Sequence, residues 1–127
     1  MSSLSKVLFF LPLFAALSGI PSIAAGAAND PLVVVASVKV KPGTVDAFKS
    51  AADKVSISTR TQAGNLSYGF YQSIEAPNEF VTYETWRSMA DLNAHLQSQV
   101  MKDFFAEVGG FFEPGYPQVN TYQKTGQ

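Results

Sequence analysis

The chain has one histidine, one tryptophan and no cysteine, so the histidine is its one side chain that ordinarily titrates near neutral pH. The histidine, His95, closely follows the tryptophan, Trp86, and Glu84 stands just before that tryptophan. An imidazole changes charge near neutral pH, so His95 has the right pKa range for a general base. A lone helical histidine is also commonly a core residue, and both interpretations stay open here. One histidine without cysteine disfavours a metal site, and no G-x-S-x-G sequence indicates a serine nucleophile.

A strand that leads into a helix must position these residues. Two-residue alternation separates the side chains of this strand onto two faces. The inner face has Phe80, Thr82, Glu84 and Trp86, and the outer face has Val81, Tyr83 and Thr85. After the strand, Ser88 is predicted to begin one continuous helix through a capping box. Its hydroxyl would accept from the Asp91 amide, and the Asp91 carboxylate would reach back to the Ser88 amide. The apolar spacing of that helix turns His95 toward the core.

The remaining segments predict three more strands and one more helix. Strands are expected over 32–40, 66–74 and 118–123, with a helix from Val45 to near Gly64 that Thr44 can cap. In strand 66–74, alternation separates Tyr68 and Phe70 from Tyr71. The order β-α-β-β-α-β predicts an α+β, ferredoxin-like fold with both helices on one face of an antiparallel sheet. The uncovered face predicts a homodimer, sheet against sheet, with a pocket between each sheet and its own helices.

Residues 1–28 have the pattern of a secretory signal peptide, which makes 29–127 the single mature domain. Lys6 precedes an apolar run, and small residues around Ala25-Gly26-Ala27 offer a cleavage site. Pro12 and Pro21 interrupt the run, which disfavours a membrane span, and an uncleaved N-terminal anchor stays open as the alternative. After cleavage we expect no stable membrane span. The protein is therefore expected to be secreted or periplasmic. A formal net charge of −1 gives no attraction for nucleic acid or an anionic membrane.

Five short segments together resemble the antibiotic biosynthesis monooxygenase family of small dimeric α/β barrels. They are VKVKPG from Val38, AGNLSYGFY from Ala63, YETWRS from Tyr83, LNAHLQS from Leu92 and MKDFF from Met101. The Glu-x-Trp strand end and the Ala-His-Leu helix are especially similar to the quinol monooxygenase branch. The resemblance covers about Leu32 to Lys124, and it depends on the order and spacing of the segments.

The resemblance implies oxidation of a small aromatic phenol, hydroquinone or anthrone-like substrate by dioxygen, without flavin, haem or metal as a cofactor. Such chemistry needs a base, a slot for a flat ring and few competing waters. His95 would be the base, and Trp86 a further catalytic candidate in the slot. The candidate substrate-binding residues are Tyr68, Phe70, Tyr71, Tyr83 and Glu84. A haem-degrading branch of similar fold uses Asn, Trp and His where this chain has Ala36, His95 and Phe105, which disfavours haem degradation.

Each candidate also has a structural interpretation. Trp86 can be core packing, and a buried Glu84 must be paired, for which Arg87 or Arg60 are the expected partners. Two further classes of function stay open besides the monooxygenase. One is a non-catalytic binder of small aromatic or lipid-like molecules in the same pocket, and the other is a purely structural dimerising domain.

Overall fold

The computed structural model describes residues 30–126, and in that range a four-stranded sheet lies against three helices. The elements follow the chain as β1 (Leu32–Lys39), α3 (Val45–Thr59), β2 (Asn65–Gln72), β3 (Glu79–Trp86), α4 (Met89–Leu96), α5 (Gln99–Val108) and β4 (Gln118–Gln123). The sheet order is β2-β3-β1-β4, and each neighbouring pair is antiparallel. The ferredoxin-like fold is thus confirmed. The predicted signal, 1–28, lies outside the described residues and stays a prediction.

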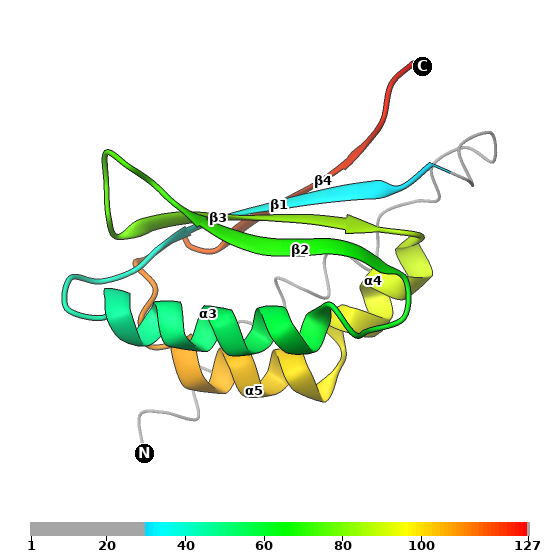
Figure 1. Ribbon diagram of the computed structural model, residues 1–127. Coiled ribbons are helices and arrows are strands. Elements are labelled where there is room, and N and C mark those ends of the chain that lie inside the picture. Colours follow the sequence, from blue (N-terminus) through cyan, green and yellow to red (C-terminus); the bar gives the residue numbers. More distant parts are fainter. Residues whose placement is uncertain (1–29, 127) are drawn as a thin grey trace.

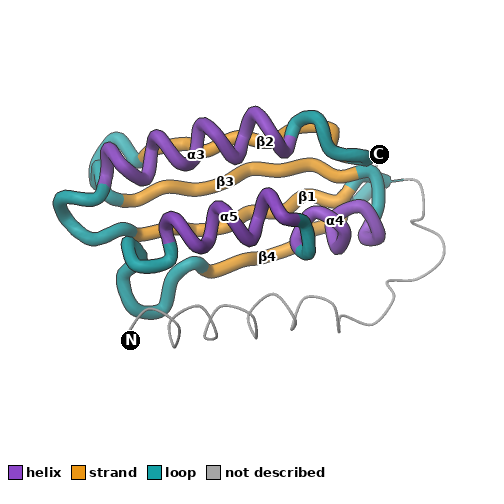
Figure 2. The backbone as a smooth tube through the Cα atoms, turned by 90° about the horizontal axis from the view of Figure 1, so that it is seen from below, coloured by secondary structure: helices purple, strands orange, loops and turns teal. Residues whose placement is uncertain are grey.

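The three helices of residues 30–126 lie on one face of the sheet (Figure 1), and α3 and α5 run side by side beneath it (Figure 2). The core between these layers contains Val38, Phe48, Phe80, Trp86 and Phe104, all of which are buried. Phe48 is completely buried and makes ring contacts with four other phenylalanines. Between residues 30 and 126 we find no helix that is both long enough and apolar enough to cross a membrane.

The predicted alternation of β3 is confirmed, because Glu84 and Trp86 are buried while Val81 and Tyr83 are exposed. The alternation predicted for β2 is correct only in part. Tyr68 points inward, but Leu66 is 57% exposed because the pairing of β2 with β3 shifts between Asn65 and Ser67. Such a bulge moves a side chain to the opposite face of a sheet. The strand also ends at Gln72, before the predicted Ile74.

The single helix predicted after Ser88 is wrong, since the structure has two helices. The first ends at Leu96, and Ser98 adopts an extended backbone conformation from which α5 begins. The Ser98 hydroxyl caps α5 by accepting a hydrogen bond from the Met101 amide at 3.3 Å. The helix predicted to run from Val45 to near Gly64 ends earlier, at Thr59. Thr44 makes no side-chain cap, because its hydroxyl donates to the Lys41 carbonyl instead.

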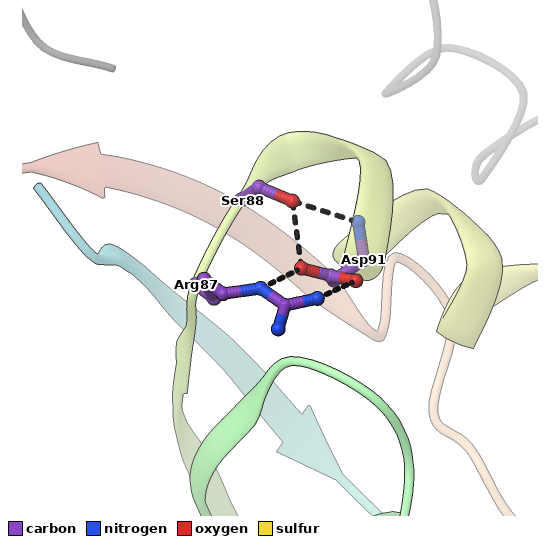
Figure 3. Close-up of polar contacts among 3 residues, drawn as sticks. All are labelled: Arg87, Ser88 and Asp91. Atoms are coloured by element: carbon purple, nitrogen blue, oxygen red, sulfur yellow. Dashed lines mark hydrogen bonds and ion pairs between the residues drawn. The ribbon is translucent and has the colours of Figure 1, made fainter. Parts of the chain in front are cut away.

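The predicted capping box at Ser88 is half correct. The Ser88 hydroxyl accepts from the Asp91 amide at 3.1 Å, as expected. The Asp91 carboxylate, however, accepts from the Ser88 hydroxyl at 2.7 Å and from Arg87 through two bonds of 3.0 Å (Figure 3). Arg87 and Ser88 hold the pKa of Asp91 below its ordinary value through these bonds. The turn from β3 into α4, which places Trp86 and His95, is therefore fixed by charge-assisted hydrogen bonds.

Candidate functional site

A cavity of about 40 Å³ lies between the inner face of the sheet and helices α4 and α5. Most of its lining is aliphatic or aromatic, and it includes side chains from β1, β2, β3 and both helices. Its polar lining is limited to Tyr68, Thr82, Glu84 and His95. The volume gives room for roughly three water molecules. A ring-sized ligand must therefore displace side chains as it enters.

His95 contributes a neutral imidazole to this cavity. The side chain is only 2% exposed, and its ring lies 4.7 Å from the Trp86 ring and 5.7 Å from the Tyr68 ring, measured between centroids. Burial lowers its pKa to about 4, because the charged imidazolium is poorly solvated there. The Nδ1 atom is 2.6 Å from Oε1 of Gln62, whereas Nε2 has no hydrogen-bond partner among the described residues. The imidazole thus keeps one nitrogen available to a ligand.

Gln62 is a polar partner of the site that sequence reasoning missed. It lies in the connection between α3 and β2, far from His95 in the sequence. Its backbone is held in a turn, with the amide donating to Thr59 and the carbonyl accepting from Asn65. No periodic pattern marks a single glutamine in a loop, so nothing in the sequence could have paired it with the histidine.

Glu84 is buried without a cation, so the predicted pairing with Arg87 or Arg60 is wrong. Arg87 binds Asp91, and Arg60 donates to the Tyr68 carbonyl at 3.0 Å. The Glu84 carboxyl instead accepts from the Trp86 indole at 2.9 Å. Burial raises the pKa of Glu84 to about 7, although hydrogen bonds from Trp86 and Thr82 oppose the shift. Near neutral pH the cavity therefore contains a carboxyl group that is protonated in much of the population.

Trp86 is completely buried, but it is not among the residues that line the cavity. It lies behind them, with its ring tilted by 32° against His95 and its indole nitrogen bonded to Glu84. Its contacts indicate that it positions two of the polar lining residues, His95 and Glu84. Trp86 was predicted to contact the ligand in a slot for a flat ring, and such a contact would require this packing to rearrange.

The other candidate residues divide between the two faces of the sheet. Tyr68 and Phe70 line the cavity, beside His95 and Glu84. Burial, together with the nearby Glu84, raises the pKa of Tyr68 well above its ordinary value, so its hydroxyl stays protonated. Tyr71 and Tyr83 are 59% and 44% exposed and do not line the cavity. Tyr71 instead borders an open depression elsewhere, so neither is placed to touch a ligand in the cavity.

The arrangement supplies a hydrogen-bond acceptor, Nε2 of His95, and a donor, protonated Glu84, within apolar surroundings. Among residues 30–126, no lysine or arginine lines the cavity to compensate an anion. Neutral, mostly apolar ligands with a few polar atoms fit such a site best. Within residues 30–126 no cluster of histidine, aspartate and glutamate is suited to hold a metal ion.

The fold and the cavity define a small α+β domain with a buried site between the sheet and its helices. The family profile described as antibiotic biosynthesis monooxygenase matches residues 31–107. This chain therefore belongs to the antibiotic biosynthesis monooxygenase family, as its sequence motifs predicted.

Similar proteins agree with this assignment. An uncharacterized protein from Synechocystis is 34% identical over 77 residues, which are 61% of this chain and 52% of that protein. The chain thus spans about half the length of that relative. "Putative monooxygenase YcnE" from Bacillus subtilis is 29% identical over 60% of this chain and 80% of its own length. A solved structure of a conserved protein from Methanosarcina mazei has a TM-score of 0.72 and 25% identity, and it covers 80% of this chain and 100% of its own.

Proposed function

We propose that this protein is a cofactor-independent monooxygenase that oxidises a small aromatic phenol, hydroquinone or anthrone-like substrate with dioxygen. The observation that carries the proposal is Nε2 of His95, a buried acceptor without a partner at an apolar cavity. Membership of a monooxygenase family supports the reaction class. The names of relatives such as YcnE agree with it.

In this proposal Nε2 of His95 accepts a proton from the substrate. Its low pKa keeps the imidazole unprotonated, and the substrate anion then stabilises the imidazolium beside it. The anion passes one electron to dioxygen, and the two radicals combine to form a C–O bond. Cleavage of the O–O bond leaves a carbonyl group and releases the second oxygen atom as water. For an anthrone the methylene group supplies both hydrogens of that water, so no external reductant is needed.

Glu84 and the apolar lining would assist this reaction in different ways. Protonated Glu84 can donate a hydrogen bond to a substrate oxygen, and that bond would strengthen as the oxygen gains charge. The apolar lining limits the water that could quench the anion or the peroxide. The binding of Glu84 to Trp86 keeps the carboxyl in place during this change.

The test is oxygen consumption with a panel of hydroquinones and anthrones, corrected for the rate without protein. His95→Gln keeps size and polarity but removes the base, so it should lower kcat on the order of 100-fold while changing binding much less. Tyr71→Phe on the outer face is the matched control and should keep the wild-type rate. A His95→Gln variant that folds normally and consumes oxygen at the wild-type rate would refute the assignment of the base.

A second candidate, a non-catalytic binder of small aromatic molecules, is favoured by the low pKa of His95. A pKa of about 4 makes the imidazole a weak base if no anion stabilises its protonated form. Measuring the binding of the same compounds beside the oxygen assay separates the two candidates. Binding without oxygen consumption supports this second function, and the absence of both would contradict both candidates.

A further inference from the structure

The inference concerns Gln62, which ties the α3–β2 connection to the polar end of the cavity. Its side-chain oxygen lies 2.6 Å from Nδ1 of His95. Its side-chain nitrogen donates to the Ser98 hydroxyl at 3.2 Å. The amide group of Gln62 therefore connects His95 of α4 to Ser98, the N-terminal capping residue of α5.

Ser98 anchors the nitrogen end of the Gln62 amide, and the oxygen end faces the histidine. The Ser98 hydroxyl oxygen accepts from the Met101 amide and from the nitrogen of Gln62. With its nitrogen used in this way, Gln62 presents its oxygen to Nδ1. An oxygen can only accept, so Nδ1 must carry the hydrogen of the neutral imidazole, and Nε2 keeps a lone pair. The break between α4 and α5 matters here, because it places Ser98 within reach of Gln62.

The rest of the pocket holds the imidazole in this orientation. The rings of Trp86 and Tyr68 pack against it, and Nε2 is buried without a partner among the described residues. Rotation of the ring would exchange the two nitrogens, but it would break the bond to Gln62. A buried acceptor without a partner is costly, and a ligand that donates a hydrogen to it removes that cost.

We propose that Gln62, anchored by Ser98, is a positioning residue that fixes His95 as a hydrogen-bond acceptor, so that the cavity selects ligands with a neutral hydroxyl group. Phenols satisfy Nε2, whereas ligands of the same shape that lack the hydroxyl leave it unpaired. The inference rests on the proposed function only in assuming that the cavity is the ligand site. For a phenol or hydroquinone substrate, the hydroxyl that binds Nε2 is then the one that would lose its proton in the reaction.

The first test is the tautomer of His95, which nitrogen-15 NMR of the side chain measures directly. The chain has a single histidine, so the imidazole signals need no further assignment. At pH 7 we expect a protonated Nδ1 and an unprotonated Nε2 in the wild-type protein. Gln62→Leu should give a mixture of both tautomers, while Gln62→Glu, which keeps an accepting oxygen, should retain the wild-type tautomer. A wild-type protein with hydrogen on Nε2 would overturn the inference.

The second test compares ligands that differ only at one group, 4-ethylphenol and 4-ethyltoluene, in NMR titrations of the backbone amides. The wild-type protein should bind the phenol about tenfold more tightly, which corresponds to one hydrogen bond. Gln62→Leu should remove most of this preference. Gln72→Leu is the matched control, since this glutamine donates to Pro77 in an exposed hairpin and should leave the preference unchanged. Equal affinities of the wild-type protein for the two compounds would overturn the selection of hydroxyl groups.

These measurements do not depend on turnover, so the two proposals can fail separately. The expected tautomer and preference without oxygen consumption would leave this inference standing and refute the monooxygenase proposal. Oxygen consumption by a protein with hydrogen on Nε2 would leave the monooxygenase activity standing, but it would refute this inference and the assignment of Nε2 as the base.

Discussion

Two ionisable residues of the cavity, His95 and Glu84, have their pKa values shifted in opposite directions by the same cause. Burial lowers the pKa of His95 from 6.5 to about 4 and raises the pKa of Glu84 from 4.5 to about 7. Each environment favours the neutral form of its residue, so the polar groups face a ligand mainly as uncharged partners. This explains how a carboxyl and an imidazole can share an apolar cavity without an ion pair.

The opposite shifts predict a pH dependence of stability that single substitutions reveal. Because folding lowers the pKa of His95, the free energy of unfolding decreases as the pH falls from 6.5 toward 4. Because folding raises the pKa of Glu84, the free energy of unfolding decreases as the pH rises from 4.5 toward 7. The two contributions oppose each other in the wild-type protein. Glu84→Gln should therefore lose stability on acidification relative to wild type, and His95→Gln should lose it as the pH rises. Each change should be on the order of 2 to 3 kcal/mol between pH 4.5 and 6.5.

Urea unfolding at several pH values between 4.5 and 8 measures this effect. Both substitutions also change packing, but that cost is nearly independent of pH, so the slope is the relevant quantity. Glu75→Gln, at an exposed carboxyl in a turn, is the matched control and should follow the wild-type profile. If the free energy of unfolding depended on pH in the same way in wild type, Glu84→Gln and His95→Gln, the shifted pKa values of both residues would be contradicted.

At the residue scale, the sequence predicted the inward direction of side chains but not their partners. Alternation in β3 and helical spacing after it correctly placed Glu84, Trp86 and His95 inside. Alternation does not show which partner each side chain takes. Arg87 forms an ion pair with Asp91 in the turn, and Glu84 accepts a hydrogen bond from the indole of Trp86. Gln62 reaches His95 from a loop, where residue type and spacing carry no directional information.

At the scale of elements, the turn from β3 into α4 depends on the loop that follows α3. The Gly64 carbonyl accepts from the Arg87 amide at 2.8 Å, and Asp91 lies directly against the Gly64 α-carbon. Gly64 has a positive φ of 77°, and a β-carbon at this position would overlap the Asp91 side chain. The loop that carries Gln62 and the helix that carries His95 are thus packed together at a position that only glycine fits.

Gly64→Ala should consequently destabilise the protein more than the same substitution elsewhere. Gly43 is the matched control, because its φ of 85° is similar but a β-carbon there would meet no atom within 4 Å. We expect Gly43→Ala to cost about 1 kcal/mol from backbone strain alone, and Gly64→Ala about 1 to 3 kcal/mol more from overpacking. Thermal and urea unfolding of the two variants measure the difference. Equal losses of stability would show that the contact with Asp91 is unimportant.

The order and kind of the elements could be predicted well, but the break between α4 and α5 could not. The apolar spacing from Met89 to Phe104 is close enough to helical to hide an interruption. Serine occurs both at helix caps and inside helices, so the presence of Ser98 does not by itself indicate an interruption. Its hydroxyl bonds to Met101 and Gln62 favour the extended conformation, and the second of these is a tertiary contact.

At the scale of the whole molecule, the helices of residues 30–126 cover one face of the sheet, and within this range no helical layer covers the other (Figure 1). The outer face presents large apolar or aromatic side chains that are 40% to 59% exposed: Tyr71, Val81, Tyr83 and Tyr122. Neighbouring strands bring these residues onto one surface, since Val81 pairs with Tyr71 across β2 and β3. An apolar surface of this kind typically marks a site of association.

We predict that this outer face forms the interface of a homodimer, in which two sheets pack together about a two-fold axis. In analytical ultracentrifugation the purified protein should sediment as a dimer at micromolar concentration. Val81→Asp places a charge in the middle of the face, and its desolvation should shift the protein to monomers or aggregates. Ile74→Asp is the matched control, because this residue is 93% exposed beyond the end of β2 and should leave the dimer intact. A wild-type monomer at this concentration, or a dimer that Val81→Asp does not weaken, would show that the outer face has a different role, and Tyr71 and Tyr83 would then be free to contact another partner.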